Sequence, residues 1–244
     1  MKTIFSVAVA AVCMLCTSAL FADITLNDVN FRTFGPVNPD VTGATPLSHG
    51  GMPLVVSLTA SNQDVDGDSV IDADFTFDVV FSSMTTGGGV SLWGQGVSNS
   101  NAAGTGNTFS NIEGIMIEVQ NVSGVTSSGE TVEFAGFSNF GLGTFDFSGN
   151  EGANQAALVN GNLLEANFAG MGTGGTAEFA GGLPGGLATT LSVQNAAVTS
   201  GTQAGSRIIR TLDLQFTSVS AIPEPSSVIV LGLAGVALGL RRRK

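Results

Sequence analysis

Carboxylates recur at almost every second position of one short segment of this chain, Asn62–Asp74. Its acids are Asp64, Asp66, Asp68, Asp72 and Asp74, with Gly67 among them. A tight turn at this glycine would direct alternate side chains toward one point, and carboxylate oxygens suit Ca²⁺. The segment therefore predicts a calcium site formed by Asp64, Asp66, Asp68 and Asp72. The alternative is a solvated acidic turn that leads into a strand beginning at Phe75.

This acidic segment resembles the Asp-rich calcium loops of dockerin and thrombospondin type 3 repeats. It departs from the EF-hand pattern, because the twelfth position counted from Asn62 is Ala73 and the bidentate acid of that pattern is missing. Carboxylates packed this densely repel one another unless a cation neutralises them. The sequence supports calcium binding and a solvated turn equally.

The other candidate catalytic or binding residues do not belong to a recognisable motif. His49 is the only histidine, and no Gly-x-Ser-x-Gly motif supplies a serine nucleophile. A glycoside hydrolase needs two carboxylates across a cleft, and any acidic β-protein offers such candidates, here Glu113, Glu118, Glu130, Glu133 and Glu151. Trp93 could stack on a sugar ring, but one Trp without any Tyr makes a small platform, and packing in the core is the alternative. The sequence assigns no catalytic residue and predicts a protein that is not an enzyme.

Positive charge is concentrated at the two ends of the chain. Five of the eight Lys and Arg residues are Lys2 and the terminal four, so only Arg32, Arg207 and Arg210 remain between them. All nineteen acids lie between Asp23 and Glu224, and three cations against nineteen acids give that region a net charge of −16. Such a surface repels polyanions, which argues against nucleic-acid binding.

Residues 23–220 have the composition and patterning of an all-β domain. Glycine is abundant (34) and proline sparse (7), which suits short strands joined by turns. Two segments alternate apolar and polar residues, 75–82 and 211–217, and each predicts a half-buried antiparallel strand. Weaker candidates are residues 24–34, 53–60, 90–93, 115–122, 131–137, 144–147, 163–168, 177–179 and 187–193. These strands predict a single jelly-roll-like β-sandwich.

The N-terminus has the three parts of a secretory signal peptide, assigned to residues 1–22. Lys2 is the positive region, residues 4–16 are apolar, and residues 17–22 offer small side chains to signal peptidase. Cleavage after Ala19 and cleavage after Ala22 both remain open. The only cysteines, Cys13 and Cys16, would leave with the signal, so the mature chain is expected to lack thiols and disulfides.

The C-terminal segment, residues 221–244, has a proline-flanked acid, an apolar stretch and a cationic end. These are Pro223, Glu224 and Pro225, then residues 228–240, then Arg241, Arg242, Arg243 and Lys244. An uncharged apolar stretch favours hydrocarbon, and the cations after it are expected to stay cytoplasmic. The stretch is shorter than the roughly 17 to 25 residues that normally span a bilayer, which favours a temporary anchor over a permanent one.

The parts of this tail, in this order, resemble the PEP-CTERM sorting signal of Gram-negative bacteria. The resemblance implies that an exosortase, a transpeptidase of the inner membrane, recognises Pro223, Glu224 and Pro225. It also implies that residues 228–240 form a transient transmembrane helix, that Arg241–Lys244 stop transfer, and that the body reaches the cell surface or extracellular matrix.

Together these features favour an exported structural or adhesive protein in an exopolysaccharide or biofilm layer. The expected partners are signal peptidase, the exosortase and extracellular polysaccharide, and Ca²⁺ is the one cofactor considered. A carbohydrate-binding module that uses Trp93 is the alternative, and a secreted polysaccharide hydrolase or lyase is less well supported, because few acid–base and nucleophilic side chains are present.

Overall fold

The structure is a computed structural model that describes residues 23–31, 41–44, 53–64, 71, 74–84, 89–93, 96–100, 114–126, 129–144, 154–168, 176–197, 199 and 207–219. Within these residues the chain forms thirteen strands and no helix. The all-β expectation is therefore confirmed for the described part of the chain.

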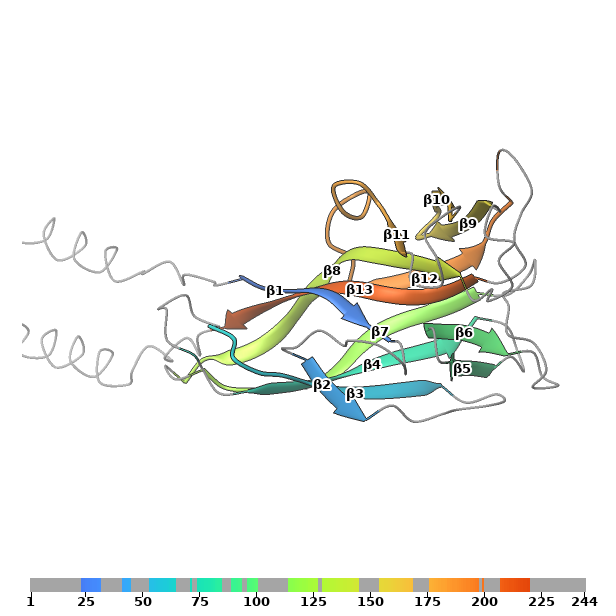
Figure 1. The fold of residues 1–244 in the computed structure, drawn as a ribbon. Coiled ribbons are helices and arrows are strands. Elements are labelled where there is room, and N and C mark those ends of the chain that lie inside the picture. Colours follow the sequence, from blue (N-terminus) through green and yellow to red (C-terminus); the bar gives the residue numbers. More distant parts are fainter. Residues whose placement is uncertain are drawn as a thin grey trace, which may run out of the picture.

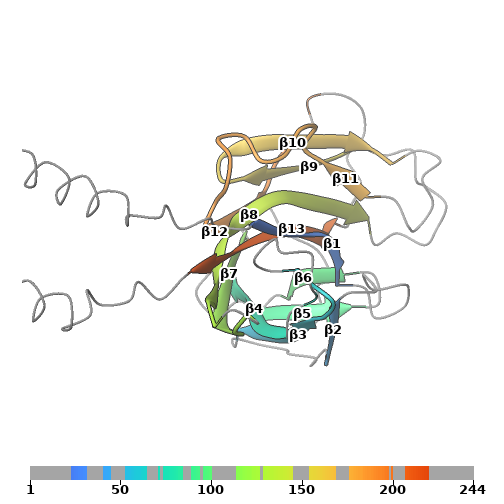
Figure 2. The same cartoon turned by 90° about the vertical axis from the view of Figure 1, so that its left-hand side faces the viewer.

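The strands form two antiparallel sheets (Figure 1). Sheet A has the order β11 (Thr176–Glu178), β8 (Thr131–Thr144), β13 (Arg207–Val219), β6 (Gly96–Ser100) and β5 (Gly89–Trp93), and β1 (Asp23–Asn30) also pairs with β13. Sheet B has the order β10 (Asn162–Asn167), β9 (Asn154–Val159), β12 (Thr190–Asn195), β7 (Gly114–Ser123), β4 (Phe75–Ser83), β3 (Leu54–Ala60) and β2 (Val41–Ala44). The turned view in Figure 2 shows β13 and β8 of sheet A lying above β3 and β4 of sheet B.

Alternating apolar side chains from both sheets form one hydrophobic core. The predicted inward faces of β4 and β13 are confirmed, since Phe75, Phe77, Val79, Phe81, Leu212, Leu214 and Phe216 are all buried. Phe216 joins the two sheets, because its ring centroid lies 4.8 Å from that of Phe75 and 5.5 Å from that of Phe134. Burial of such aromatic pairs contributes more than their apolar area alone.

Strand β8 is longer than its sequence predicts. A strand was expected at 131–137 and another at 144–147, but β8 continues to Thr144, and residues 145–147 lie outside the described residues. Its glycines allow close contact with β13, because a Cβ on Gly143 would lie 2.6 Å from Nε of Arg210. Strands β2, β6 and β9 were not expected, and the strand predicted at 187–193 begins only at Thr190.

The hairpin of β9 and β10 is fastened to β12 by its turn. Asn160 and Gly161 have φ angles of 49° and 79°, the left-handed conformation that an Asn-Gly turn favours. Oδ1 of Asn160 accepts hydrogen bonds from the backbone N–H (2.7 Å) and Oγ (3.2 Å) of Ser192, and Nδ2 donates to the carbonyl of Thr190 (3.1 Å). One side chain therefore satisfies three polar groups of the neighbouring strand.

Replacement of Asn160 by alanine is expected to destabilise the fold by about 2 to 3 kcal/mol, because hydrogen bonds are lost and alanine disfavours the left-handed conformation. Asn160→Gly keeps the backbone freedom and loses only the hydrogen bonds, so its effect should be smaller. Urea unfolding followed by circular dichroism measures both. Equal stability of the alanine variant and the parent protein would contradict the role of this turn.

Candidate functional site: the end of the sandwich next to the sorting tail

The first and last described strands place Asp23 and Val219 at one end of sheet A. Strand β1 is the first after the predicted signal peptide, and β13 is the last before residues 221–244. They are antiparallel, with Asp23 opposite Thr217, while Val219 pairs with Thr131 of β8 (Figure 1). We call this the attachment end and define it by Asp23, Ser123, Thr131 and Val219.

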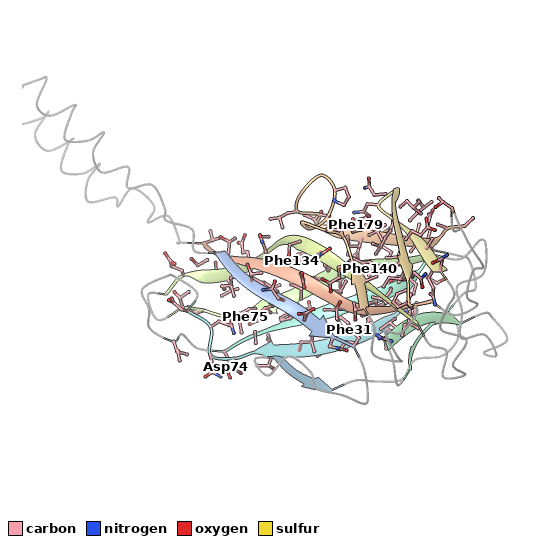
Figure 3. The ribbon with its side chains drawn as sticks, turned by 45° about the horizontal axis from the view of Figure 1, so that its top comes forward. Phe31, Asp74, Phe75, Phe134, Phe140 and Phe179 are labelled. Carbon is pink, nitrogen blue, oxygen red and sulfur yellow. The ribbon has the colours of Figure 1, made fainter. Side chains whose placement is uncertain are left out.

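Two connections of the chain meet the same end. The turn between β7 and β8 lies here, since Val219 pairs with Thr131. The β3–β4 connection also begins and ends here, because Ala60 pairs with Phe75, whose ring contacts Phe216. Figure 3 shows Asp74 and Phe75 on the same side of the molecule as the start of β1. Asp64 and Asp74, at the described ends of the predicted calcium segment, therefore lie near the end of β13, which the sequence pattern did not predict.

The covalent reach of the tail keeps this end near the membrane anchor. An extended chain spans about 3.3 to 3.6 Å per residue, so Pro223 lies within about 14 Å of Val219 and the apolar stretch begins within about 32 Å of it. The body of the protein is longer, since the thirteen residues of β13 span about 40 Å. The position of the anchor therefore constrains which end of the body lies near it.

Three carboxyl groups meet on the outer face of sheet A, beside β1. The register of β1 against β13 shifts between Leu26 and Val29, and Asp28 adopts a positive φ of 55° there. Its backbone N–H donates to Oδ1 of Asp213 at 2.7 Å. Glu178 of β11 lies within electrostatic range of both, and its Oε1 accepts a hydrogen bond from Oγ1 of Thr211 at 3.0 Å. This cluster could not be predicted from the sequence, because its members come from three distant segments.

The environment makes two of these carboxyl groups retain protons more readily than free side chains. Burial raises the pKa of Glu178 above its ordinary value of 4.5; the hydrogen bond from Thr211 opposes this, and the negative charges of Asp213 and Asp28 add to it. Burial likewise raises the pKa of Asp213 above 3.8, against the hydrogen bond from the Asp28 backbone and with the charge of Asp28. The arrangement favours binding a proton among neighbouring acids.

Replacement of Glu178 by glutamine is expected to raise the melting temperature at pH 7. A raised pKa means that the folded chain binds more protons than the unfolded chain, so stability falls as the pH rises above 4.5. Glutamine abolishes that dependence, and its advantage should vanish below about pH 4, where both states carry the protonated acid. Thermal unfolding over a pH series measures the effect, with Glu133→Gln as the control, because Glu133 is an exposed residue of β8. A lower melting temperature at pH 7 would show that the stronger hydrogen bond from Thr211 to a charged acceptor outweighs the cost of the negative charge.

The predicted calcium ligands lie largely outside the part of the chain that the structure describes. Asp64 is exposed at the end of the described stretch that follows β3, whereas Asp66, Asp68 and Asp72 are outside the described residues. Among the residues that are described, no three His, Cys, Asp or Glu side chains are placed to hold a metal ion. Calcium binding therefore stays a prediction.

The structure separates the described acids considered for glycoside hydrolysis. Glu118 of β7 follows core residue Ile117 and faces away from the core of sheet B, while Glu133 of β8 follows buried Val132 and faces outward from sheet A. These two side chains are therefore on opposite faces of the sandwich. Glu130 lies in the turn before β8, and His49, Glu113 and Glu151 lie outside the described residues. Trp93 ends β5 opposite Gly96, but its side chain is not among those described.

Comparison with protein families identifies the tail. Residues 221–244 match the model of the PEP-CTERM protein-sorting motif. This segment is a PEP-CTERM sorting signal. The match confirms the identification made from Pro223, Glu224, Pro225 and the residues that follow, and it supports export through an exosortase-type system with transient anchoring in the membrane. The PEP-CTERM signal covers the last 24 residues and does not identify the β-sandwich.

The remaining comparisons add no relative of the body. No curated protein and no solved structure matches the chain. Within the described strands and turns, no helix is long and apolar enough to cross a bilayer. The PEP-CTERM signal itself, including residues 228–240, lies outside the described residues.

Proposed function

We propose that the chain is a structural or adhesive protein of the cell surface or extracellular matrix of a Gram-negative bacterium, without catalytic activity of its own. The observation that carries the proposal is the PEP-CTERM signal at residues 221–244. That signal begins two residues after the last strand of the sandwich, so the β-body as a whole is the cargo of the sorting system.

The chemistry of the body fits a polysaccharide-rich layer. Residues 23–220 carry 18 acids and three arginines, and this net charge of −15 keeps the body soluble and repels it from other anionic surfaces. The outer face of sheet B is polar where it is described: Asp78 of β4 accepts hydrogen bonds from Oγ of Ser57 (2.6 Å) and from Nδ2 of Asn121 (2.7 Å). Hydroxyl, amide and carboxylate groups of this kind can exchange hydrogen bonds with sugar hydroxyls, directly or through water.

The experiment expresses the tagged full chain in a host that has an exosortase and secretes polysaccharide. The mature body is expected in the matrix fraction and should become soluble when polysaccharide synthesis is deleted. A test variant in which Asp78 and Asn121 are replaced by Ala should be retained less strongly, because it lacks the polar side chains of this face. Recovery of the mature body entirely in the medium, with polysaccharide present, would contradict a matrix role.

A further inference from the structure

The attachment end of the body carries exposed carboxylates. At the attachment end Asp64, Asp74 and Glu133 are exposed, and Glu133 pairs with Thr217 near the end of β13. By sequence, the connection between Asp64 and Asp74 carries three further aspartates and no Lys or Arg. This end therefore presents negative charge next to the point where the chain continues toward the anchor.

At the opposite end of the body, the arginine whose side chain is described, Arg210, is buried. Arg207 and Arg210 lie in the first residues of β13, and Arg32 follows Phe31, whose N–H donates to the carbonyl of Arg210 at 3.0 Å. The ring of Phe31 packs 5.1 Å from that of Phe81 near the end of β4, so this end of sheet A coincides with that of sheet B. We call it the far end; Met84 and Gln194 lie there, both beside Gly114.

The tail keeps the acidic attachment end within reach of the membrane. Val219 lies within about 32 Å of the start of the apolar stretch, while β13 is about 40 Å long. Anionic phospholipids give a bilayer a negative surface potential that attracts cations and repels carboxylates over about one Debye length, roughly 10 Å in 0.1 M salt. Covalent attachment and electrostatics therefore act in opposite directions at this end.

We propose that the attachment end is the surface that the body presents to an anionic bilayer, and that its carboxylates hold the body off the lipid while the tail is attached and drive it away once the tail is cut. The proposal rests on the anchored stage of the proposed function and not on the matrix role. Carboxylates at this end favour release, since a body with exposed arginines there would adsorb to the membrane that it has to leave.

The first part of the test measures which end faces the bilayer. Because residues 23–244 contain no Cys, single variants Ser123→Cys at the attachment end and Met84→Cys at the far end can carry a donor dye. The full chain from residue 23, anchor included, is inserted into vesicles that contain an acceptor lipid. Energy transfer is expected to be at least about twofold higher from position 123, since the two ends are separated by most of the length of the strands. Equal transfer, or higher transfer from position 84, would overturn the orientation.

The second part compares vesicles rich in phosphatidylglycerol with vesicles of phosphatidylcholine. Transfer from position 123 should be lower with the anionic lipid, and added salt should remove the difference. The triple variant Asp64→Asn, Asp74→Asn and Glu133→Gln should also remove it. The matched control is Met84→Lys, Gln194→Lys and Ala197→Lys, which makes the same change in net charge at the far end, with the dye again at position 123. This control should preserve the difference in transfer between the two lipids.

Equal transfer in the two lipids for the parent chain, or an equal effect of the two triple variants, would overturn the repulsive role. All six substituted positions are exposed, and circular dichroism with a thermal melt shows that each variant is folded. The vesicle assay contains no polysaccharide, so a negative result there would not contradict the proposed matrix role. Conversely, recovery of the mature body in the medium would contradict the matrix role and not the orientation at the bilayer.

Discussion

Replacement of Phe216 by alanine is expected to lower the free energy of unfolding by about 3 to 5 kcal/mol, the range measured for removal of a buried phenyl ring. Phe216 is fully buried, and its ring centroid lies 4.8 Å from Phe75, 4.9 Å from Phe77 and 5.5 Å from Phe134. The change removes contacts to both sheets at once and leaves a cavity between them. Domains are stable by only about 5 to 15 kcal/mol, so much of the native stability is at risk.

Urea unfolding followed by circular dichroism measures this loss as a lower midpoint with an unchanged slope. The matched control is Gln215→Ala, the neighbouring residue on the outward face of β13, which should change stability by less than about 0.5 kcal/mol. A loss at Phe216 no larger than that at Gln215 would mean that this ring does not hold the two sheets together.

Replacement of Pro223, Glu224 and Pro225 by alanine is expected to leave the full chain in the inner membrane. The PEP-CTERM signal is the segment that an exosortase recognises, and without its two prolines the region before the anchor is free to become helical. Release into the medium or matrix should fall by tenfold or more, an effect on the order of 1.4 kcal/mol or greater in recognition. Membrane fractionation and mass spectrometry of the C-terminus measure it.

The control for this change is Ser226→Ala with Ser227→Ala, which alters the next two residues and keeps the proline-flanked acid. It should be processed like the parent chain. An unaltered Lys244 on parent protein recovered outside the cell would contradict processing, and equal release of the alanine variant would show that other residues of the tail are recognised.

The fold could be predicted from sequence where a strand has one apolar and one polar face. Strand β4 carries a clear period of two, and so does the second half of β13. The prediction of strands failed where the alternation of apolar and polar residues is interrupted by close packing between strands or by burial of both faces. Gly141 and Gly143 suggest a break, yet they are glycine because β13 places Thr211 and Arg210 against the backbone of β8. Strand β9 contains mostly small and amide residues before Val159, and it is buried on both faces, so it shows no alternation.

One part of the candidate site could be predicted from the sequence and another could not. The PEP-CTERM signal could be identified because its parts are consecutive in the chain, and their order is itself the signal. The carboxyl cluster could not, because Asp28, Glu178 and Asp213 meet only through a register shift in β1 and the pairing of β11 and β13 with β8. The burial of Arg210 was also unexpected. A register shift between Ile209 and Thr211 interrupts the alternation of β13, so that Ile209 and Leu212, three positions apart, both lie in the core.

The pairing of β1 with β13 joins the first and last described strands of the chain. Asp23 and Thr217 are 194 positions apart, so the first strand to leave the cytoplasm has no partner until nearly all of the chain has followed it. Before β13 arrives, β8 and β6 lack the strand between them, and the aromatic cluster around Phe216 is incomplete. Closure of sheet A therefore requires β13, the strand that directly precedes the sorting tail in the chain.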